Sequence, residues 1–135
     1  MGRATQRRER RLAQDLKALA ERNPSHFNRI WNLYVVGWCE EIAARTRSLN
    51  SKHRKDTRGI AVLFDVSKKA ERLLAMMGPT AERQVGTHTR EILNHECCKA
   101  VEALTGTHLY YPDTDSIWRL LRGEPRRERG YAAHK

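Results

Sequence analysis

The sequence predicts an all-α protein, a four- to five-helix up-and-down bundle around one long aromatic helix. Apolar residues recur at intervals of three and four in several separate stretches, which is the period of an amphipathic helix. Glycine, proline or small polar residues stand at the ends of these stretches, where helices start and stop. With 135 residues, of which 39% are hydrophobic, the chain can build one modest core.

The central helix is expected over about residues 25–47. Its large side chains fall on one line at steps of four, three, four and four, and a second line of Ile30, Leu33 and Gly37 runs beside it. Two of the three tryptophans belong to this helix, so the other helices have to cover it. The first line consists of Phe27, Trp31, Tyr34, Trp38 and Ile42.

Further helices are expected before and after the central one. A first helix covers about 5–22, a third about 59–77 and a fourth about 87–104, with Thr87 or Thr89 as its cap and Gly106 as its stop. A short helix follows Asp113, and a basic loop occupies 48–59. We divide the chain into a basic helical extension (1–11), one helical domain (12–122) and a flexible, disordered basic C-terminal tail (123–135).

Residues 60–77 allow a second interpretation. Ile60 and Ala61, then Asp65 to Ser67, and then Arg72 to Leu74 resemble the helix-turn-helix pattern. The resemblance implies a DNA-binding regulator. One unbroken helix is preferred, because it leaves Glu71 outside, whereas the motif would bury this carboxylate without a partner.

The positive charge is concentrated in three segments of the chain. Residues 1–22 hold seven basic and three acidic residues (+4), 45–58 six and one (+5), and 117–135 six and two (+4), while the whole chain carries +10. Nineteen of the 26 basic residues are arginine, whose planar guanidinium suits phosphate groups. Such segregation is typical of proteins that bind nucleic acid, although a basic surface also serves solubility.

An up-and-down topology would place the start of the first helix and the end of the second at one basic pole. We therefore expect a low-specificity, phosphate-directed accessory protein for DNA or RNA. The binding residues expected are Arg7, Arg8, Arg10, Arg11, Arg45, Arg47, Lys52, Arg54, Lys55, Arg58, Arg126, Arg127 and Arg129.

The alternative is a protein-interaction module that docks on an acidic partner or associates with itself, with Trp118, Tyr110 and Tyr111 as anchors. An enzyme is not expected, because the chain has no nucleophile and base pair, carboxylate pair or phosphate-binding glycine loop. We expect no cofactor and assign no catalytic residue. The oligomeric state stays open.

One helix face collects residue types that bind metals: His88, Glu91, His95 and Cys98. A zinc site needs four converging ligands, and this spacing matches no ligand signature, so a solvated face is the expectation and no metal is assigned. Three cysteines, two of them adjacent, make a poor disulfide framework and indicate reduced thiols. Without an apolar segment of membrane length, the expected location is cytoplasmic.

Overall fold

The computed structural model describes residues 2–49 and 60–106. Within these ranges nearly all residues are helical and none lies in a strand, so the all-α prediction is confirmed. The elements are α1 (Arg3–Arg22), α2 (Pro24–Leu49), α4 (Phe64–Met77), the single turn α5 (Pro79–Ala81), the π-helix η1 (Glu82–Gly86) and α6 (Thr87–Thr105).

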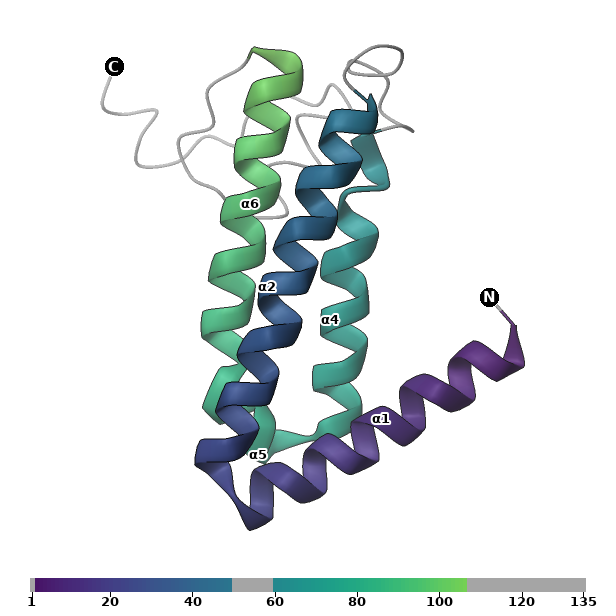
Figure 1. Ribbon diagram of the computed structural model, residues 1–135, viewed down its shortest axis with the longest axis vertical. Coiled ribbons are helices and arrows are strands. Elements are labelled where there is room, and N and C mark those ends of the chain that lie inside the picture. Colours follow the sequence, from purple (N-terminus) through teal and green to yellow (C-terminus); the bar gives the residue numbers. More distant parts are fainter. Residues whose placement is uncertain (1, 50–59, 107–135) are drawn as a thin grey trace, which may run out of the picture.

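Three of the helices run up, down and up side by side. Figure 1 shows α2 between α4 and α6, with α4 antiparallel to both. The first helix departs from the expected up-and-down arrangement: α1 crosses the end of the bundle where α2 begins and α4 ends, and its N-terminal part points away (Figure 1). The reason lies in its sequence, because its buried residues, Ala13, Leu16 and Ala20, all come from its second half.

The core gathers on the aromatic line of α2. Phe27, Trp31, Trp38 and Ile42 are buried, whereas Tyr34 is only partly buried and packs at the edge. The rings of Trp31 and Trp38 meet edge to face at 5.3 Å between centroids, a favourable aromatic geometry. Four of the five residues of the predicted line therefore lie on the buried face of α2, to which Val35 and Leu49 also belong.

A buried hydrogen bond joins α2 to α6. The indole Nε1–H of Trp31 donates to the hydroxyl of Thr89 over 2.7 Å, and Thr89 is 1% exposed. The prediction that Thr87 or Thr89 caps a helix is wrong, because α5, η1 and α6 follow one another without a break and no side chain caps α6. Thr89 instead satisfies a polar atom inside the core.

The third predicted helix is interrupted near its start. Ile60 and Ala61 are helical, Val62 and Leu63 form a turn, and α4 begins at Phe64. The predicted unbroken helix is wrong at that turn. The helix-turn-helix interpretation also fails, since it requires its turn at Asp65, which lies in the first turn of α4.

Glycines end two of the helices, α4 and α6. Gly78 (φ 87°) ends α4, and Gly106 (φ 74°) ends α6 as predicted; both have backbone angles that favour glycine. At Gly86, within η1, a Cβ would lie 2.6 Å from a carboxylate oxygen of Glu82, so a larger residue there would displace the end of that side chain. Most of the predicted basic loop, the short helix after Asp113 and the basic tail lie outside the described residues.

Candidate nucleic-acid interface

The N-terminal part of α1, residues 3–11, forms a basic arm that extends from the bundle (Figure 1). Five arginines of this arm are exposed, and none has an ion pair with another described residue. Spacings of four and three place Arg3, Arg7 and Arg10 on one line of the helix, with Arg11 and Arg8 to one side. The arm thus presents a row of unpaired guanidinium groups.

The acidic residue of the arm, Glu9, is turned the other way. Its carboxylate Oε2 lies 3.0 Å from Nη2 of Arg72 on α4, and its side chain is 16% exposed. Its negative charge is therefore neutralised by the bundle. Within the described part of the chain, no carboxylate pairs with the arginines on the outer face of the arm.

The second half of α1 anchors the arm. Leu12, Ala13, Leu16, Leu19 and Ala20 lie on the same side of the helix as Glu9 and pack against the core. The change from apolar to charged residues within one helix explains why the arm leaves the bundle. Rigid anchoring also fixes the direction in which the arginines point.

The other predicted binding residues divide into two groups. Arg45 is partly buried and engaged: it pairs with Glu41 at 2.7 Å and donates to the backbone carbonyl of Val62. Arg47 is exposed. Both lie towards the C-terminal end of α2, whereas the arm leaves the bundle near the opposite end (Figure 1). The expectation of one basic pole is therefore wrong for the described arginines, because α1 crosses the bundle instead of running along it.

The second group has no structural description. It consists of Lys52, Arg54, Lys55, Arg58, Arg126, Arg127 and Arg129, which lie outside the described residues.

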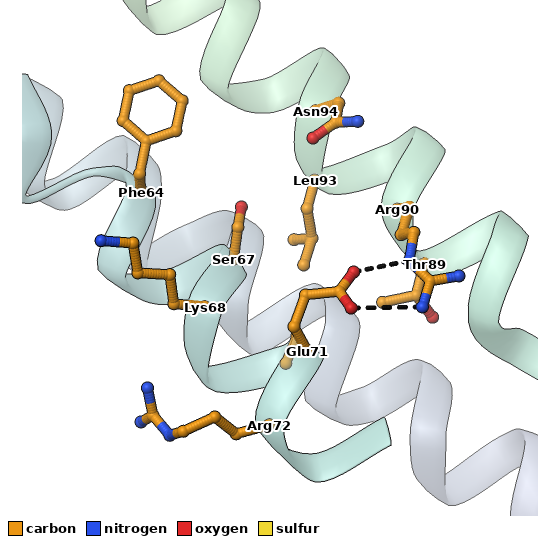
Figure 2. A pocket seen from close by; sticks show the side chains of 10 residues that line it. Phe64, Ser67, Lys68, Glu71, Arg72, Thr89, Arg90, Leu93 and Asn94 are labelled. Atoms are coloured by element: carbon orange, nitrogen blue, oxygen red, sulfur yellow. Dashed lines mark hydrogen bonds and ion pairs between the residues drawn. The ribbon is translucent and has the colours of Figure 1, made fainter. Parts of the chain in front are cut away.

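A groove of about 450 Å³ separates α4 from α6. Figure 2 shows Lys68 and Arg72 on the α4 side and Arg90 on the α6 side. The carboxylate of Glu71 and apolar side chains form other parts of the wall, so the groove combines charges of both signs with a hydrophobic surface. Its lining residues are Phe64, Ser67, Lys68, Ala70, Glu71, Arg72, Thr89, Arg90, Leu93 and Asn94.

The charge of Arg90 is already neutralised within the protein. Its guanidinium binds Glu71 of α4 (Nε to Oε1, 2.6 Å) and Glu82 of η1 (Nη2 to Oε2, 3.0 Å), as Figure 2 shows for Glu71. The hydrogen bond from Arg90 lowers the pKa of Glu82, and the two carboxylates raise the pKa of Arg90. Arg90 therefore fixes α6 to α4 and η1 and has little capacity left for an anion.

The histidine and cysteine cluster does not converge. His88, Glu91 and His95 are exposed, while Cys98 is buried. Among the described residues no group of three or more possible ligands could hold a metal ion. The expectation that Cys98 lies beside the polar side of the helix is wrong, because it faces the core with its Sγ 3.7 Å from a carboxylate oxygen of Glu102.

The cysteines are free thiols with low reactivity. Burial raises the pKa of Cys97 and of Cys98 to about 11, and it also raises the pKa of the half-buried Cys39. The hydroxyl of Ser67 lies 3.7 Å from the sulfur of Cys97. Both groups are protonated at neutral pH, so this pair is not an activated nucleophile.

Sequence reasoning missed Arg3 and the Glu9 to Arg72 contact. Arg3 lies before Thr5, the expected start of the first helix, whereas α1 begins at Arg3. The position of Glu9 could have been found from the helical period, since it lies three and seven residues before Leu12 and Leu16. Its partner on α4 depends on how two helices cross, which the sequence does not reveal.

No helix among the described residues is long and apolar enough to cross a membrane. Comparisons with protein-family models, with curated proteins and with solved structures found no match for this chain.

Proposed function

We propose that this protein is a nucleic-acid-binding accessory protein that holds phosphate groups with the arm of α1. The observation that carries the proposal is the row of exposed arginines on the arm, which form no ion pair with residues 2–49 or 60–106 and from which the carboxylate of Glu9 is turned away. A helix about 10–12 Å in diameter fits the major groove of a DNA duplex, and guanidinium groups bind phosphates in a bidentate way.

Low sequence specificity is part of this proposal. Contacts to phosphate position a protein on a nucleic acid but carry no sequence information. The arm presents mostly arginine, so charge is its main means of recognition. The free thiols of Cys39, Cys97 and Cys98 fit a reducing, cytoplasmic location, and a binding protein needs no catalytic group.

Fluorescence anisotropy with labelled duplex DNA, single-stranded DNA and RNA at two salt concentrations tests the proposal. The parent protein should bind, and its affinity should fall steeply with salt. Replacing Arg7, Arg8, Arg10 and Arg11 together by Gln should weaken binding. The slope of log affinity against log salt should become shallower by up to about 0.9 per lost contact on duplex and 0.7 on single strands.

The matched control replaces exposed arginines away from the arm, Arg22 and Arg83, by Gln. This variant should keep the slope of the parent, and circular dichroism should show unchanged helicity in both variants, because Gln is a comparable helix former. A parent that binds no nucleic acid at low salt contradicts the proposal and leaves an acidic protein as the partner for the same arginines. An unchanged slope in the arm variant would exclude the arm as the phosphate-binding element.

A further inference from the structure

The outer face of α2 exposes large apolar side chains. Leu33 is 70% exposed and Val36 54%, the highest values among the exposed large hydrophobic residues of the described chain. Small residues flank them: Gly37 and Ala44 are exposed, and a Cβ at Gly37 would meet nothing within 4 Å. This face lies opposite the buried line of Trp31 and Trp38 and therefore points outward. Because its flanking residues are small, a neighbouring helix could approach it closely.

Charged residues frame the apolar pair at helical spacing. Arg29, Leu33, Val36 and Glu40 follow one another at steps of four, three and four, which is the spacing of a coiled-coil seam. All four are exposed. Neither Arg29 nor Glu40 has an ion pair with another described residue, so both charges are available for a partner.

The seam of one copy is complementary to the seam of a second copy that runs in the opposite direction. The midpoint between Arg29 and Glu40 falls between Tyr34 and Val35, and so does the midpoint between Leu33 and Val36. A two-fold axis at this point would place Arg29 of one copy against Glu40 of the other at both ends. Between these two ion pairs, Leu33 of each copy would meet Val36 of its partner.

We propose that two copies of this chain associate through the outer faces of α2, packed antiparallel about this axis. The antiparallel orientation follows from charge. A parallel pair would set Arg29 against Arg29 and Glu40 against Glu40, and like charges at an interface are repelled. The reversed pair matches opposite charges and keeps the apolar residues in contact.

The face is also rigid before any partner arrives. Phe27, Trp31 and Trp38 hold the inner side of α2 in the core, and Trp31 is fixed by its hydrogen bond to Thr89. A preorganised helix loses little conformational entropy on association. A single helix pair is a small interface, so we expect a weak dimer that forms as concentration rises.

Sedimentation velocity without nucleic acid measures the association, so its outcome is independent of the arm. The mass of the parent should rise from monomer to dimer with concentration, examined up to about 1 mM, where even a millimolar Kd is visible. Leu33→Gln should weaken the dimer by about tenfold or more, since each copy loses an apolar contact. Met76→Gln is the matched control, because Met76 is an exposed apolar residue of α4 and its loss should leave the mass unchanged.

Charge reversal tests the orientation. Arg29→Glu or Glu40→Arg alone creates like-charge contacts at both ends and should weaken the dimer by about tenfold at low salt. The double variant Arg29→Glu/Glu40→Arg restores opposite charges and should dimerise like the parent. Reversing Arg83, an exposed charge of η1, should have no effect.

Three results would overturn the inference. A parent that stays monomeric at the highest concentration has no self-association through α2. Single charge reversals that dimerise like the parent exclude the antiparallel seam, and so does a double variant no better than the singles. Circular dichroism of every variant separates loss of association from loss of folding.

Discussion

The core around Trp31 and the joint at the base of the arm are each held by a polar contact, but of different kinds. The first is a neutral hydrogen bond, Trp31 to Thr89, buried among aromatic and aliphatic side chains. The second is an ion pair, Glu9 to Arg72, in which the Arg72 side chain remains 40% exposed. One contact lies inside the bundle and the other where α1 leaves it.

The two contacts differ in how much stability the protein should lose when each is broken. A buried donor that loses its acceptor cannot be satisfied by water, so the core contact is costly to break. Water can replace the partner of an exposed charged group, so breaking the ion pair at the joint should cost little stability. The arm can therefore differ in charge while the bundle stays folded, and four predictions examine this contrast from the largest effect to the smallest.

Trp31→Ala should have the largest effect. The side chain is 1% exposed and contacts Phe27 and Trp38, so its removal leaves a large cavity and an unpaired Thr89. We expect a loss of about 3–5 kcal/mol in the free energy of unfolding, measured by urea denaturation. A variant that unfolds at the same urea concentration as the parent would show that α2 is not the centre of the core.

Thr89→Val should have an intermediate effect. Valine has nearly the same shape but no hydroxyl, so the indole N–H of Trp31 stays buried without an acceptor, at a cost of about 1–3 kcal/mol. Thr89→Ser keeps the hydroxyl and serves as the control for the hydrogen bond. In the double variant Trp31→Phe/Thr89→Val both polar groups are absent, so its loss should be smaller than the sum of the single losses.

The Glu82 carboxylate makes a contribution to the stability of the fold that depends on pH. Because the hydrogen bond from Arg90 lowers its pKa below 4.5, its contribution is complete above the ordinary pKa and decreases as the pH falls below it. Glu82→Gln should lower the melting temperature by about 1–4 °C at pH 7, since the pair is partly exposed. Below pH 4 the difference between parent and variant should shrink. A difference that stays constant down to about pH 2 would contradict the assignment.

The sequence predicted the parts of the fold that depend on periodicity along one helix. The buried line of α2 and the end of α6 at Gly106 are examples. The direction of α1 was wrong, because the short connection at Asn23 limits the position of α1 but not its crossing angle. The role of Thr89 was missed for a similar reason: a threonine near a helix start suggests a cap, and the indole that it binds lies 58 residues away.

The candidate interface was partly predictable on the same grounds. Counting charges located the arginines of the arm, and the absence of apolar residues from Thr5 to Arg11 indicated that they project. The engagement of Arg45 by Glu41 and the carbonyl of Val62 was not predictable, because it requires the position of the turn before α4. Charge composition therefore indicates which arginines are candidates for binding. Tertiary contacts decide which of these arginines are already engaged by other groups of the protein.

Glu9→Gln should have the smallest effect on stability and is the sharpest test of the contrast. The ion pair with Arg72 is partly exposed, so its loss should cost less than about 1 kcal/mol. Nucleic-acid affinity should stay the same or rise, because the arm loses a negative charge. Its salt dependence should not change, since no phosphate contact is removed. Arg72→Gln breaks the same ion pair but leaves the Glu9 carboxylate, 16% exposed, without its partner, so it should cost more stability than Glu9→Gln and should not increase affinity. Urea denaturation and anisotropy titration of the two variants decide the question: a loss of several kcal/mol in Glu9→Gln would make the joint part of the core, and weaker binding would mean that Glu9 positions the arm.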